Sequence, residues 1–95
     1  MRILLVEDDR YFSGILSDYL GHVGFEVLAA TDGRAALDLF EEERVDLVLT
    51  DVLMPRLSGL ELAARLKENG DGEGPPVLLM SAVYQDASDI ESNLR

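Results

Sequence analysis

Short apolar runs alternate with longer segments of helical periodicity along this chain. Three continuous apolar runs, at 3–6, 47–49 and 77–80, are bounded by charged residues, glycine or proline. Such runs are typical of strands that are buried on both faces, as in a parallel sheet covered by helices. A fourth run, at 25–29, alternates between apolar and other residues, which predicts a strand nearer the edge of the sheet.

Between these runs the hydrophobic period changes from two to 3.6 residues, which predicts amphipathic helices. The first helix is predicted to end at Gly24, a suitable residue after a helix C-terminus. Its apolar stripe consists of Phe12, Ile15, Leu16, Tyr19 and Val23. A second helix is predicted after Asp32, an N-cap residue, and a third at the capping box of Ser58 and Glu61. A fourth is predicted from near Asp86.

The resulting order is β-α-β-α-β-α-β-α, which predicts the α/β class with a doubly wound parallel sheet. In such folds the ligand site lies outside the carboxyl ends of the strands, at the point where the strand order reverses. The residues that follow each predicted strand are therefore the candidates for chemistry.

Composition and charge narrow the function classes. The chain has 95 residues, of which 47% are hydrophobic, so we expect one globular domain with its own core. It has no cysteine, which excludes disulfides and thiolate zinc sites. Eight basic residues are scattered among 19 acidic ones, for a net charge of −11, so we expect no direct nucleic-acid binding. With no membrane-length apolar run and no signal-peptide pattern, we expect a cytoplasmic protein without membrane contact.

Acidic and hydroxyl side chains follow three of the predicted strands. Glu7, Asp8 and Asp9 follow the first strand, Asp51 follows the third and Ser81 follows the fourth. If the first and third strands are neighbours, their carboxylates repel one another. A hard divalent cation such as Mg²⁺ relieves that repulsion, and so does protonation of one acid, which raises its pKa. Beside a metal, Asp51 can act as a nucleophile towards phosphorus, and Ser81 can donate its hydroxyl to a phosphate oxygen.

Three segments of the sequence together resemble the receiver domain of two-component response regulators. They are ILLVEDD at the N-terminus, DVLMPRLSG around Asp51 and LLMSA around Ser81. The spacing of these residues also fits the family's pattern, since Asp51 lies 43 positions after Asp8 and Ser81 lies 30 positions after Asp51. The resemblance implies a flavodoxin-like strand order, 2-1-3-4-5, and one receiver domain over residues 1–95, incomplete at its C-terminus.

The resemblance also implies a role for each matching residue. Asp51 is expected to be the phosphoacceptor, and Ser81 the switch hydroxyl that turns toward the phosphoryl group. Asp8 and Asp51 are expected to bind Mg²⁺ directly, together with the backbone carbonyl of Leu53, and Glu7 to act through water.

The chain departs from the family pattern at its C-terminal end. A receiver has a fifth strand, which ends in a lysine, and a fifth helix, and this sequence reaches Arg95 before either. Its one lysine, Lys67, falls in the third predicted helix and cannot replace the missing one. We expect a truncated receiver rather than a degenerate one, because the acidic residues and Ser81 are all retained. The fourth strand then becomes an exposed edge and apolar side chains of the first helix are uncovered, so we expect self-association.

The function expected from these features is a signalling switch rather than a turnover enzyme. Asp51 would accept a phosphoryl group from a sensor histidine kinase or phosphotransfer protein. A phosphohydrolase with an aspartyl nucleophile is an alternative function, although resemblance to that family would require an aspartate, as general acid, where this chain has Leu53. A phosphorylation-independent interaction module is the other alternative, because the conserved lysine of the family is missing.

Overall fold

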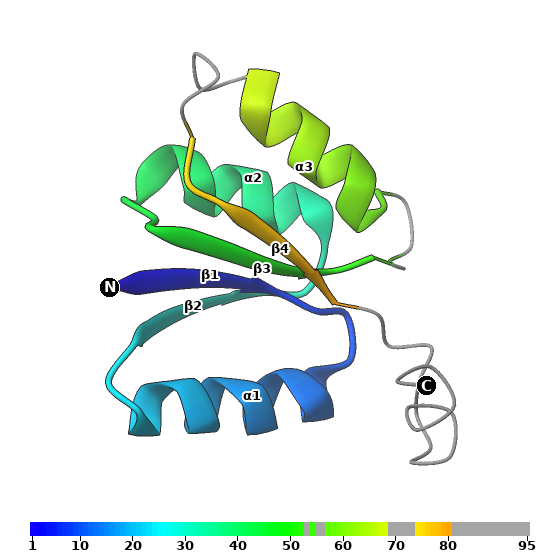
Figure 1. Ribbon diagram of the computed structural model, residues 1–95. Coiled ribbons are helices and arrows are strands. Elements are labelled where there is room, and N and C mark those ends of the chain that lie inside the picture. Colours follow the sequence, from blue (N-terminus) through cyan, green and yellow to red (C-terminus); the bar gives the residue numbers. More distant parts are fainter. Residues whose placement is uncertain (53, 55–56, 69–73, 81–95) are drawn as a thin grey trace, which may run out of the picture.

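The computed structural model describes residues 1–52, 54, 57–68 and 74–80 (Figure 1). Strands and helices alternate in this part of the chain as the sequence predicts. The elements are β1 (Arg2–Val6), α1 (Arg10–His22), β2 (Glu26–Ala30), α2 (Gly33–Glu42), β3 (Leu47–Asp51), α3 (Gly59–Glu68) and β4 (Val77–Met80). The fourth helix predicted near Asp86 lies outside the described residues.

The described strands form one parallel sheet in the order β2-β1-β3-β4. This confirms the predicted α/β fold and the first four positions of the predicted strand order. β2 lies at an edge of the sheet, as its alternating sequence predicts. β1 and β3 are central neighbours, and their register pairs Val6 with Thr50. The strand order reverses between these two strands, so their carboxyl ends form the switch point.

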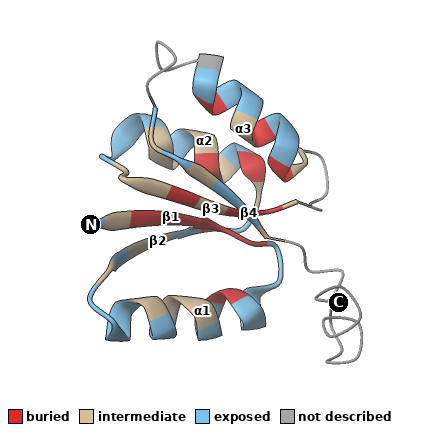
Figure 2. Cartoon of the chain, in the orientation of Figure 1, coloured by how far each residue is buried: buried red, intermediate tan, exposed pale blue. Residues whose placement is uncertain are grey.

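Helices cover both faces of the sheet. α2 and α3 lie on one side and α1 lies on the other (Figure 1). The main core fills the space between the sheet and the helices α2 and α3, and Figure 2 shows the buried residues concentrated there and along the central strands. Its buried members are Leu4, Val6, Ala30, Ala36, Val48, Leu62 and Leu66.

Local signals fix the helix ends. The Asp32 carboxylate accepts a hydrogen bond from the Ala35 N–H at 2.8 Å, as expected of an N-cap. Ser58 and Glu61 form the predicted reciprocal capping box, in which the Glu61 N–H donates to the Ser58 hydroxyl at 3.2 Å. Gly24 follows the C-cap of α1 and has a φ of 106°, a conformation that favours glycine.

The apolar stripe of α1 is largely exposed. Ile15, Tyr19 and Val23 are 51%, 63% and 54% exposed, which confirms the expectation of uncovered apolar side chains on this helix. The more buried face of α1 is offset from the stripe and includes two serines, Ser13 and Ser17. Hydrophobic periodicity identifies the apolar stripe of a helix, but the neighbouring elements decide which part of it is covered.

No helix in the described part of the chain is both long enough and apolar enough to cross a membrane.

Substitution of two leucines of α3 can test how much the main core contributes to the free energy of unfolding. Leu62 is fully buried, whereas Leu60 is 60% exposed. We expect Leu62→Ala to lower the free energy of unfolding by about 2–5 kcal/mol, because it leaves a cavity in the main core. The matched change Leu60→Ala should alter it by less than about 0.5 kcal/mol. Urea denaturation measures both, and equal effects would contradict the described position of α3.

Candidate functional site

The carboxyl ends of β1 and β3 bring together three acidic side chains. Asp51 is the last residue of β3, and Glu7 and Asp8 follow β1 directly. Because β1 and β3 are paired in register, the side chains meet although Asp51 lies 43 positions after Asp8 in the sequence. One carboxylate oxygen from each residue lies within 4.8 Å of the others. The structure thus brings together the three acidic residues predicted from the sequence.

The three carboxylates differ in burial. Glu7 and Asp51 are each 1% exposed, and Asp8 is exposed. At 4.8 Å, two unit charges repel by about 3 kcal/mol at an effective dielectric constant near 20. That energy is a large fraction of the stability of a small domain, so the site requires a proton or a cation.

Glu7 is the carboxyl group of this cluster whose pKa is raised. Burial raises the pKa of Glu7 from its ordinary value of 4.5 to about 7, and the charges of Asp51 and Asp8 act in the same direction. A hydrogen bond from the Asp9 N–H to Oε1 of Glu7, at 3.2 Å, opposes this rise in pKa. The expectation that one acid has a raised pKa is therefore confirmed, at Glu7.

The donor set fits a hard divalent cation. Oε2 of Glu7 is buried and finds no hydrogen-bond partner among the residues that the structure describes. Such an oxygen is costly to bury unless a cation, a bound water or a proton shared with Asp51 satisfies it. Asp8 keeps one side of the cluster open to solvent, which suits Mg²⁺ because this ion retains several water ligands.

Asp9, the third acid after β1, has a different role. Its Oδ1 atom accepts hydrogen bonds from the N–H groups of Tyr11 and Phe12, at 3.0 and 3.1 Å, so it is the N-cap of α1. This cap was not predicted from the sequence. The available signal was an aspartate directly before the first helical stripe.

The loop that follows Asp51 returns closely to it. The Gly59 N–H donates to the Val52 carbonyl at 2.9 Å, and a Cβ atom at Gly59 would lie 2.2 Å from the Asp51 carbonyl oxygen. Only glycine fits there without moving the backbone. The Thr50 hydroxyl, also missed from the sequence, donates to the same carbonyl at 3.1 Å.

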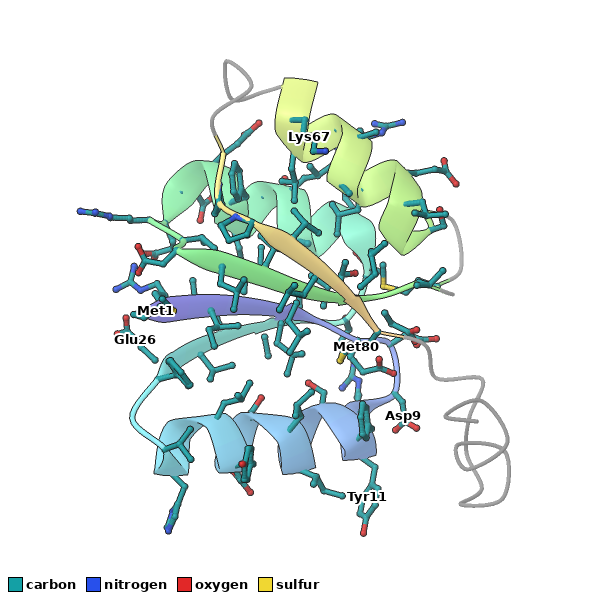
Figure 3. The ribbon with its side chains drawn as sticks, viewed as in Figure 1. Met1, Asp9, Tyr11, Glu26, Lys67 and Met80 are labelled. Carbon is teal, nitrogen blue, oxygen red and sulfur yellow. The ribbon has the colours of Figure 1, made fainter. Side chains whose placement is uncertain are left out.

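Two of the predicted site residues, Leu53 and Ser81, lie outside the described residues. Met80, which precedes Ser81, pairs with Asp51 across β3 and β4, and its carbonyl accepts from the Val52 N–H at 2.8 Å. Lys67 lies on α3, far from the carboxyl end of β1 where Asp9 lies (Figure 3). Its position agrees with the expectation that it does not replace the family's lysine.

The raised pKa of Glu7 predicts how stability depends on pH in the absence of divalent cations. The folded chain holds this proton up to about pH 7, whereas the unfolded chain releases it near 4.5. The free energy of unfolding should therefore include a stabilising contribution that is complete below pH 4.5 and is lost as the pH rises to about 7. Urea denaturation in EDTA across this range should show a smaller decrease for Glu7→Gln than for the wild type.

An exposed glutamate of α2 provides the control for this measurement. Glu41→Gln should leave the decrease unchanged, because Glu41 is exposed and is not a member of the acidic cluster. Identical pH profiles for the wild type and Glu7→Gln would contradict the assignment of the proton to Glu7.

Comparisons with known proteins show to which family the chain is similar. The sequence model of the family described as "Response regulator receiver domain" matches residues 3–95. The chain is 45% identical over 82 residues to "Response regulator MprA" of Mycolicibacterium vanbaalenii, an alignment that covers 86% of this chain and 35% of that protein. The corresponding protein of Mycobacterium avium is 43% identical, with the same coverage. The chain thus spans about a third of the length of these curated relatives.

Comparisons with solved structures also show a similarity to receiver domains. The chemotaxis protein CheY4 of Vibrio cholerae superimposes with a TM-score of 0.81 and 27% identity, covering 98% of this chain and 78% of that one. The signal receiver domain of a histidine kinase from Syntrophus aciditrophicus gives a TM-score of 0.79 and 32% identity, covering 99% of this chain and 70% of that one. The chain therefore belongs to the family of response regulator receiver domains.

Proposed function

We propose that the chain is a phosphorylation-dependent signalling switch, in which Asp51 accepts a phosphoryl group from the phosphohistidine of a sensor kinase or phosphotransfer protein. The observation that carries this proposal is the buried carboxylate of Asp51, held beside two further carboxylates at the switch point of a receiver fold. A cluster of this kind is costly to fold and is typical of a site whose charge is used in chemistry.

In the proposed reaction a carboxylate oxygen of Asp51 attacks the phosphorus atom in line with the leaving imidazole. A P–O bond forms as the P–N bond breaks, and the electron pair of that bond returns to the imidazole nitrogen of the donor. The return of the loop at Gly59 and the hydrogen bond from Thr50 fix the backbone of Asp51 for this attack.

Mg²⁺ is the proposed cofactor, held by Asp8 and Asp51 directly, by Glu7 through water and by the backbone carbonyl of Leu53. When bound there, it supplies positive charge that offsets the phosphoryl oxygens, which bring further negative charge to an already acidic site. We propose that the Ser81 hydroxyl donates to a phosphoryl oxygen, since the neighbouring Met80 is paired with Asp51.

Phosphorylation can be tested with a small phosphodonor. Incubation of the chain with acetyl phosphate and Mg²⁺ should add the mass of one phosphoryl group, and Asp51→Asn should abolish the addition. Asp8→Asn should slow it at least about tenfold, because it removes a carboxylate from the proposed metal site. Intact-protein mass spectrometry over time measures all three proteins.

Asp9→Asn is the matched control for Asp8→Asn. It makes the same charge change one residue away, and asparagine is an equally good N-cap for α1. We expect its phosphorylation rate to equal that of the wild type. A chain that folds but gains no mass would instead favour the interaction module that works without phosphorylation.

We further propose that copies of this chain associate through the edge of β4. Within the described residues β4 pairs only with β3, and its side chains Leu78 and Leu79 are 52% and 43% exposed. The strand carries no charge, proline or glycine, so it lacks the usual protection of an edge strand. The net charge of −11 opposes contact between copies, and salt screens this repulsion.

Sedimentation across a salt series tests this association. The mean mass should rise with ionic strength, and Leu78→Lys should suppress the rise by placing a charge on the edge. Leu60→Lys makes the same change on the exposed face of α3 and serves as the control. A monomer at every salt and protein concentration would refute the proposed edge contact.

A further inference from the structure

A pocket that is separate from the acidic cluster lies beside α2 and α3. Its volume is about 350 Å³. It is lined by Asp32, Gly33, Arg34, Leu37, Leu57 and Arg65. These residues come from the start of α2, from the loop before α3 and from α3 itself, so the pocket depends on the packing of the two helices.

Two arginines provide the positive charge of this pocket. Arg34 and Arg65 are both exposed. The ion pairs found among the described residues involve Arg2 and Arg44, and neither pocket arginine has a carboxylate partner there. The one acid of the lining, Asp32, is half-buried and already accepts a hydrogen bond from the Ala35 N–H at the start of α2.

The apolar part of the pocket is held in place by the core. Leu37 and Leu57 are partly buried and pack against the main core cluster. Leu57 also sits directly on Gly33, where an added Cβ atom would lie 2.5 Å from its Cδ2 atom. The apolar surface is therefore preformed, which reduces the entropic cost of binding.

We propose that this pocket binds an acidic segment of a partner protein, in which carboxylates flank an apolar side chain. Guanidinium groups form strong hydrogen bonds with carboxylates, and the two leucines offer contact area for an apolar group bound beside them. The charge complementarity is confined to this pocket, where Arg34 and Arg65 attract carboxylates, because the net charge of −11 repels acidic segments over most of the surface. The pocket shares no residue with the acidic cluster, so its binding can be tested without phosphorylation.

The probe is a fluorescein-labelled peptide, Gly-Glu-Glu-Leu-Glu-Glu-Gly, titrated with the full chain and followed by fluorescence anisotropy. Arg34→Glu and Arg65→Glu should each weaken binding at least about tenfold, because each reverses a charge at the pocket. Arg44→Glu makes the same charge change on a side chain that is 90% exposed and lies outside this pocket. It should change the dissociation constant by less than about twofold.

Two variant peptides test the chemistry of the segment. Glutamine in place of glutamate, and serine in place of leucine, should each weaken binding. Equal weakening by Arg44→Glu would overturn the proposal in favour of a general charge effect. The proposal would also be overturned if the parent peptide showed no measurable binding, or if the serine peptide bound as tightly as the parent. Displacement of the parent peptide by inorganic sulfate at the same concentration as the peptide would overturn it too.

Discussion

The pairing of β1 with β3 is the constraint on which the rest of the structure depends. It is stabilised by buried apolar side chains along both strands, and it forces Glu7 and Asp51 together where the strands end. The repulsion between the carboxylates cannot be relieved by moving them apart, because the register that places them also builds the core. The site must therefore recruit positive charge, and the raised pKa of Glu7 makes a proton on that carboxyl group one form of it.

The surrounding elements restrict how the site can relax. The cap of α1 at Asp9 fixes the backbone that follows Asp8, and Gly59 brings the next loop back onto Asp51. A side chain at position 59 would push the loop away, so the close return depends on a residue without a Cβ atom. Together these contacts restrict movement of the backbone at the site. The acidic cluster can therefore respond mainly by a change of its charge.

Much of this arrangement could be predicted from the sequence because it rests on local signals. Apolar runs mark the four strands, the capping box of Ser58 and Glu61 marks the start of α3, and the alternation of elements fixes a parallel sheet. The meeting of Glu7, Asp8 and Asp51 follows once β1 and β3 are taken as neighbours. The expected positions of Leu53 and Ser81 fall outside the described residues and stay predictions.

The features that could not be predicted depend on packing between distant segments. Nothing local indicates that serines line the more covered face of α1, because that depends on how the helix rests on the sheet. Arg34 and Arg65 likewise belong to different helices, and each alone reads as an ordinary solvated charge. The packing of α2 against α3, together with the contact of Leu57 with Gly33, brings the two helices and the loop into one pocket.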